Sequence, residues 1–142
     1  HVLFGKLLRH FGCLKGKTIG IWGLSFKPKT SDVREAPAQA LIADLAAAGA
    51  KVQAHDPKAM DETREALGDL QGVLYVNNQY DAVNGADALV LVTEWDIYKQ
   101  PDFKKIRTLL ASPVIFDGRN QYSPAEMKRQ GFIYYSIGRG TA

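Results

Sequence analysis

Apolar and polar residues alternate along this chain in short blocks that fit a helix and a strand by turns. Four apolar residues near the start recur at the i, i+3, i+4, i+7 spacing of one helix face, and Gly12 then ends the pattern. These residues are Phe4, Leu7, Leu8 and Phe11. The block 17–23 is short and apolar, as in a buried strand, and a helix with Pro37 in its first turn is predicted after a long polar loop.

The same alternation continues to the end of the chain. Further strands are predicted over 51–55, 73–76, 88–92, 114–116 and 132–137, with helices over 59–67, 78–84, 103–110 and 124–130. Strands that alternate with helices form a parallel sheet with helices on both faces. We therefore predict one α/β domain, a Rossmann-like three-layer fold with a mostly parallel sheet of about six strands. A flavodoxin-like strand order is the alternative.

The composition is that of an ordinary globular domain and argues against several classes of protein. The 142 residues are 46% hydrophobic and 23% charged, so a core can form without disulfides or metal. The longest strongly apolar stretch, 88–92, is too short to cross a bilayer, so no membrane partner is expected. The net charge of +3 fits an anionic partner, but without a Lys/Arg run no nucleic acid is expected. Cys13 is the sole cysteine, which favours the reducing cytoplasm.

The start of the chain has a separate interpretation. The first residue is His1 rather than Met, and an amphipathic helix at this position needs a surface on which to pack. We expect residues 1–15 to be the end of a connecting helix from an absent upstream domain, and a local lid is the alternative. Residues 16–142 then form the folded domain.

The loop after the first strand is a candidate binding element. Ligands of open parallel sheets bind beyond the carboxyl ends of the strands, where the strand order reverses, and in the Rossmann order this point lies between the first and fourth strands. The loop, 24–36, has about a dozen residues, whereas such connections usually take about two to six. Lys27, Lys29 and Arg34 give it positive charge. A solvated surface loop is the alternative interpretation.

Two further loops are expected at the same edge. Trp95 lies between two acids after the fourth strand, where it could stack on a base or sugar or instead close the edge of the core. Arg119 follows Asp117 and Gly118 after the fifth strand. Its planar guanidinium suits a phosphate or carboxylate, unless it pairs with Asp117 or another local acid.

This edge differs from a standard dinucleotide site. Gly20 and Gly23 lie at the turn after the first strand, but a full G-x-G-x-x-G is absent. Asp56 ends the second strand, where dinucleotide folds carry a ribose-binding acid, yet the long first loop puts it beyond the usual spacing. The histidines lack metal-ligand spacing, and no catalytic set is present, so we predict neither a metal nor a catalytic residue. Cys13 is interpreted as incidental.

Motifs in these loops resemble those of a known enzyme family. Residues 16–37 resemble the opening of the C-terminal, UDP-binding domain of the UDP-glucose/GDP-mannose dehydrogenase family, and of its UDP-glucose 6-dehydrogenases in particular. The most specific motifs are Phe26-Lys-Pro28, Arg34-Glu-Ala-Pro37 and Asp117-Gly-Arg-Asn120, and His55-Asp-Pro57, Thr93-Glu-Trp-Asp96 and the ending 131–139 also match. The similarity runs in order through nearly the whole chain.

The resemblance implies that residues 16–142 are the UDP-sugar-binding domain of an NAD-dependent enzyme of polysaccharide biosynthesis. Such an enzyme oxidises UDP-glucose to UDP-glucuronate. Its N-terminal domain, absent here, would bind most of the NAD and carry the catalytic cysteine, and its central helix would form a homodimer. The chain alone is therefore expected to be inactive.

The resemblance also implies roles for four residues. Phe26, Lys27 and Arg119 match positions that contact the UDP-sugar, and Arg34 matches the arginine that reaches NAD across the domain cleft. His55 stands where the family usually has tyrosine, a difference expected to affect packing rather than binding. Two alternatives are a stand-alone nucleotide-binding module and a domain of a sibling dehydrogenase for GDP-mannose or a UDP-N-acetylhexosamine.

Overall fold

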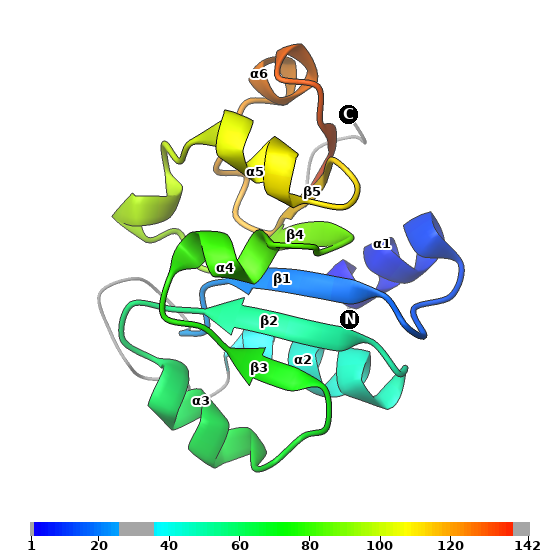
Figure 1. Ribbon diagram of the computed structural model, residues 1–142, viewed down its shortest axis with the longest axis vertical. Helices are drawn as coiled ribbons and strands as arrows, with labels where there is room; N and C mark the ends of the chain where they lie inside the picture. The colour runs from blue at the N-terminus through cyan, green and yellow to red at the C-terminus, as the bar shows by residue number, and fades with distance from the viewer. Residues whose placement is uncertain (1, 26–35, 138–142) are drawn as a thin grey trace.

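The structure is a computed structural model that describes residues 2–25 and 36–137. Within these residues, six strands form one sheet in the order β3-β2-β1-β4-β5-β6, and every pairing is parallel (Figure 1). The strands are β1 (Thr18–Trp22), β2 (Lys51–His55), β3 (Val73–Tyr75), β4 (Ala88–Leu91), β5 (Val114–Asp117) and β6 (Ile133–Ser136). This order confirms the predicted Rossmann-like fold, and the flavodoxin-like alternative is wrong.

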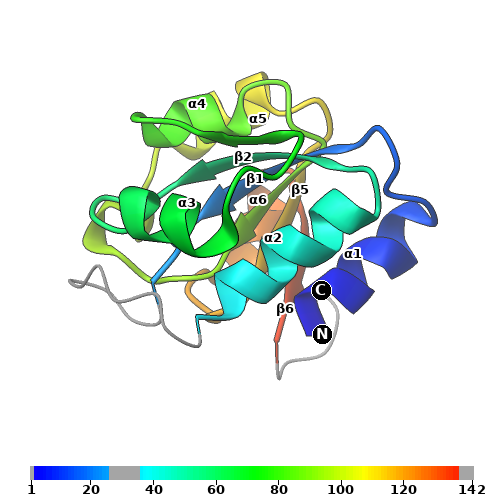
Figure 2. The same ribbon diagram turned by 90° about the horizontal axis from the view of Figure 1, so that it is seen from below.

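Helices cover both faces of the sheet. They are α1 (Val2–Phe11), α2 (Pro37–Ala47), α3 (Met60–Leu67), α4 (Gln79–Val83), α5 (Phe103–Leu109) and α6 (Pro124–Arg129). Helices α1, α2 and α3 pack on one face, and α4 and α5 pack on the other (Figure 2). Helix α6 joins the face of α4 and α5, because its Met127 is buried in the same cluster. The sequence did not predict the short 3-10 helix η1 (Asp96–Tyr98), which follows β4. None of the helices in the described part of the chain has the length and apolarity needed to cross a membrane.

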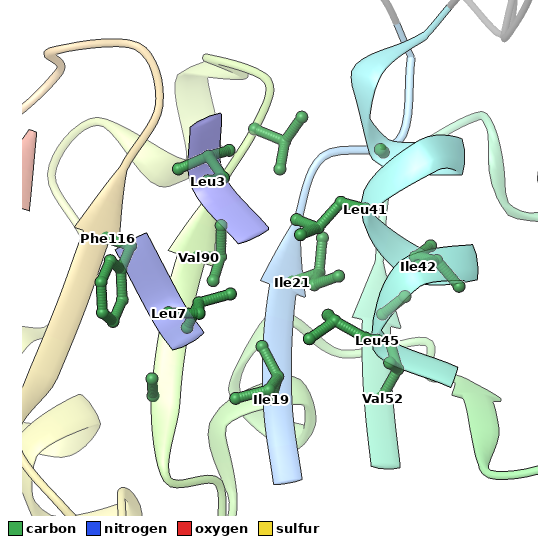
Figure 3. Close-up of a cluster of buried hydrophobic side chains, with 14 of the residues drawn as sticks. Leu3, Leu7, Ile19, Ile21, Leu41, Ile42, Leu45, Val52, Val90 and Phe116 are labelled. Carbon is green, nitrogen blue, oxygen red and sulfur yellow. The ribbon is translucent and has the colours of Figure 1, made fainter. Parts of the chain in front are cut away.

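Alternate side chains of β1 enter the two halves of the core. Ile19 and Ile21 join the cluster under α1 and α2, which Figure 3 shows in close-up. Trp22 enters the opposite cluster, under α4 and α5. Both faces of this strand are buried, as is typical of the central strands of parallel sheets. The end of β1 is thus held between two packed layers, with Ile21 in one and Trp22 in the other.

Helix α1 packs on the sheet through Leu3 and Leu7, which are both buried (Figure 3). Phe4 and Phe11 of the predicted apolar face are partly buried against the same cluster, whereas Leu8 is 41% exposed and lies outside it. Residues four apart lie above one another on a helix, and here the row of Leu3 and Leu7 contacts the sheet. His10 adds a 2.8 Å hydrogen bond between its Nδ1 atom and the Tyr135 hydroxyl. That residues 1–15 end a longer connecting helix stays a prediction.

Candidate functional site

The carboxyl ends of the four central strands meet at one edge of the sheet (Figure 1). Trp22 at the end of β1 is in register with His55 of β2 and Leu91 of β4, and Leu91 is in register with Asp117 of β5. The loops that follow these residues therefore begin side by side. This edge holds the point where strand order reverses, between β1 and β4, which is where open parallel sheets bind ligands.

Arg119 lies at this edge and is held at both ends. Its backbone nitrogen donates to Asp117 Oδ1 at 2.9 Å, and its guanidinium Nη2 donates to Glu94 Oε1 at 3.0 Å. The side chains of Arg119 and Glu94 are 41% and 36% exposed. Of the partners that the sequence left open, the acid paired with the guanidinium is thus Glu94 of the β4 loop rather than Asp117. The pair faces solvent, so a ligand can reach it.

Asp117 has a structural role in the turn that carries Arg119. Its carboxylate is fully buried, and its Oδ2 accepts from the Tyr122 backbone nitrogen at 2.8 Å and the Tyr134 hydroxyl at 2.7 Å. Burial and the Asp117 carboxylate raise the pKa of Tyr122 well above its usual 10.0, so this hydroxyl stays protonated and donates to the Tyr98 carbonyl. Asp117 is therefore already bonded and does not face a ligand.

Asp56 forms hydrogen bonds with residues of the loops after β1, β2 and β4. Its Oδ2 accepts from the Leu24 backbone nitrogen at 2.8 Å and from Trp95 Nε1 at 3.1 Å. Its Oδ1 accepts from the backbone nitrogens of Lys58 and Ala59, both at 2.8 Å. The carboxylate is 1% exposed, so it cannot hold a ribose as the acid of a dinucleotide fold does. The sequence placed Asp56 at this strand end but gave no sign of its partners beyond the Asp-Pro turn.

The aromatic residues of this edge belong to the core. Trp95 is 8% exposed with its Nε1 bonded to Asp56, so it closes the edge of the core and offers no face for stacking. His55 is also buried, with its Nδ1 2.7 Å from the Tyr98 hydroxyl, and Tyr98 stacks on Trp22. Burial lowers the pKa of His55. These contacts support a packing role for His55.

Glycine is required where β1 leaves the sheet. Gly23 has a φ of +98°, and a Cβ there would overlap the backbone nitrogen and Cβ of Thr93. The Thr93 hydroxyl in turn donates to the Ser25 carbonyl at 2.6 Å. The backbone at Gly23 and Ser25 thus lies directly against Thr93, the residue that precedes Glu94.

Several residues that the sequence singled out lie outside the described part of the chain. These are Phe26, Lys27, Lys29 and Arg34. Their roles toward a UDP-sugar or NAD stay predictions. Of the four residues implied by the family resemblance, the structure describes Arg119.

The sheet order and the helices on both faces define a Rossmann-like α/β domain, and comparison with known proteins gives its family. Residues 20–124 match the UDP binding domain of the UDP-glucose/GDP-mannose dehydrogenase family. This span is most of the chain, so the chain belongs to that family. The resemblance found in the sequence motifs is thereby confirmed.

Individual relatives agree with this assignment. The chain is 48% identical over 135 residues to a UDP-glucose 6-dehydrogenase of Pseudomonas aeruginosa, covering 92% of this chain and 30% of that protein. A UDP-glucose dehydrogenase structure from Pyrobaculum islandicum is 32% identical, with a TM-score of 0.77, over 94% of this chain and 28% of the other. An NDP-N-acetyl-D-galactosaminuronic acid dehydrogenase from Methanosarcina mazei is 29% identical, with a TM-score of 0.78, over 97% and 28%. The chain thus spans less than a third of the length of these relatives.

Proposed function

We propose that this chain is the UDP-sugar-binding domain of an NAD-dependent UDP-glucose 6-dehydrogenase, which oxidises UDP-glucose to UDP-glucuronate. One observation carries the proposal: in a domain of this family, Arg119 lies at the sheet edge that holds the switch point, with its side chain 41% exposed. A UDP-sugar brings a diphosphate, and the planar guanidinium suits phosphate oxygens. The 48% identity to a UDP-glucose 6-dehydrogenase supports this substrate over others.

The proposal assigns different work to different parts of the enzyme. Arg119 and Lys27 bind the diphosphate, and Phe26 packs on a ring of the substrate. Arg34 reaches NAD, which is bound mainly by an N-terminal domain that also carries the catalytic cysteine. Residues 1–15 continue a central helix through which the enzyme forms a homodimer. The single cysteine of this chain, Cys13, supports a cytoplasmic location.

A sibling substrate is the second candidate. The enzyme from Methanosarcina mazei is named as a dehydrogenase of an N-acetylated sugar nucleotide. Its structure matches this chain with a TM-score of 0.78, and the UDP-glucose dehydrogenase from Pyrobaculum islandicum matches it with 0.77. The sheet and its edge therefore serve enzymes for either sugar. Titration with UDP-glucose, a UDP-N-acetylhexosamine and GDP-mannose separates these substrates by affinity.

The central test compares UDP-glucose affinity and melting temperature of the full-length enzyme for Lys27→Ala, Arg119→Ala and the double variant. A charge-assisted hydrogen bond is worth about 1.5–3 kcal/mol, so each single change is expected to weaken binding roughly ten- to a hundredfold. Melting temperature should hardly change, because exposed ion pairs contribute little to stability. Lys29→Ala is the control for general positive charge. Equal losses for Lys29→Ala and Lys27→Ala would contradict the assignment of specific ligands.

A further inference from the structure

The ion pair of Arg119 and Glu94 differs from the other ion pairs found in the described residues. Those pairs join neighbours three positions apart on one helical turn, and their members are mostly well exposed: Arg64–Asp61, Lys99–Asp96 and Arg129–Glu126. Arg119 and Glu94 are 25 residues apart and lie on the loops after β5 and β4. Their pairing therefore depends on the tertiary fold and sits at the candidate site itself.

Both members of the pair stand on well-fixed backbone. Glu94 lies between Thr93, whose hydroxyl donates to Ser25, and Trp95, whose indole nitrogen donates to the buried Asp56. The Trp95 backbone nitrogen also donates to the Thr93 carbonyl at 3.1 Å, which closes a tight turn around Glu94. On the other side, the buried Asp117 holds the Arg119 backbone nitrogen. Little loop ordering is thus needed for the two side chains to meet.

The contact between the two side chains leaves room for a ligand. A guanidinium has five N–H donors in a fixed plane, and the bond from Nη2 to Glu94 Oε1 uses one of them. A phosphate can therefore bind the same guanidinium while Glu94 keeps its bond. Carboxylates orient metal-binding histidines by the same kind of hydrogen bond.

We infer that Glu94 is a positioning residue for nucleotide binding, which holds the Arg119 guanidinium at the sheet edge in the orientation that receives a diphosphate. The inference rests on the proposed function. It also predicts a direction of effect that simple electrostatics does not. Removing the negative charge of Glu94 would by itself attract an anionic ligand more strongly. A positioning role predicts weaker binding, because the released arginine must lose rotamer freedom when the ligand binds.

The experiment is titration calorimetry of the chain with UDP-glucose. Glu94→Ala is expected to weaken binding about three- to tenfold, since part of the rotamer freedom of an arginine is then lost on binding. Glu94→Gln keeps an oxygen acceptor and should restore the affinity to within about twofold of the unaltered chain. The double variant Glu94→Ala, Arg119→Ala should bind no more weakly than Arg119→Ala, because Glu94 acts through Arg119. Asp61→Asn, which removes one acid of a remote exposed pair, is the matched control.

The possible results separate this inference from the proposed function. Unchanged or tighter binding by Glu94→Ala, alongside a loss for Arg119→Ala, overturns the positioning role alone. Additive losses in the double variant also overturn it, because they mean that Glu94 contacts the ligand directly. Unchanged binding by Arg119→Ala would mean that the diphosphate does not bind at this edge. That result overturns both the positioning role of Glu94 and the proposed role of Arg119. Melting temperatures of all variants confirm that folded proteins are compared.

Discussion

Asp56 accepts four hydrogen bonds in a buried position, and its replacement by asparagine tests whether it supports the fold or binds a ligand. An asparagine has almost the same shape, but one carboxylate oxygen becomes an NH2 group, which can only donate. Whichever way the amide turns, this group faces two N–H donors that have lost their acceptor. These are either Leu24 and Trp95 or Lys58 and Ala59.

The size of the effect follows from these contacts. A buried donor left without a partner costs about 1–3 kcal/mol, so two of them should lower the free energy of unfolding by about 2–6 kcal/mol. In a domain of this size that corresponds to a fall in melting temperature of about 6–18 °C. The loss is a large share of the total stability of a typical domain, about 5–15 kcal/mol.

Urea denaturation followed by tryptophan fluorescence measures this change. Trp95→Phe removes one of the four bonds and keeps most of the packing, so it should cost less than Asp56→Asn. Asp61→Asn, whose side chain is 93% exposed, should shift stability by less than about 0.5 kcal/mol. The structural role of Asp56 would be refuted if Asp56→Asn had the same free energy of unfolding as the unaltered chain but no longer bound UDP-glucose. That result is the one expected of a side chain that binds the ribose.

Two further predictions concern stability. Gly23→Ala should be strongly destabilising, by about 3 kcal/mol or more in thermal unfolding, because its positive φ is combined with overlap against Thr93. Gly85→Ala, at a φ of +74° with open space around it, should cost only about 1 kcal/mol, and equal losses would contradict the overlap argument. Burial lowers the pKa of His55 below its usual 6.5, so the unfolded chain binds more protons as the pH falls. The stability that depends on a neutral His55 is thus fully present above pH 6.5 and is lost as the pH falls below it. In urea denaturation, the free energy of unfolding of His55→Gln should therefore fall less steeply at acidic pH than that of the unaltered chain. An unchanged pH dependence would contradict this role of His55.

The sequence alone was enough to predict the layers of this fold. Residues that alternate between strand and helix periods reveal which faces are apolar, and burial of those faces leaves few ways to stack the elements. The strand predicted over 114–116 is found at Val114–Asp117, and the known preference for the Rossmann order then places Arg119 at the sheet edge. Family motifs in the same loops then predicted that the ligand bound at that edge is a UDP-sugar.

Only the tertiary structure decided the partners of the polar side chains. The sequence left Trp95 as either a stacking platform or a core residue, and a carboxylate 39 positions earlier settled the question. Likewise, Arg119 pairs with Glu94 rather than with the nearer Asp117, whose oxygens are taken up by its own turn and by Tyr134. Periodicity reports the environment of a residue averaged over a face. A hydrogen bond instead depends on ångström-scale distances between atoms that the fold brings together from distant parts of the chain.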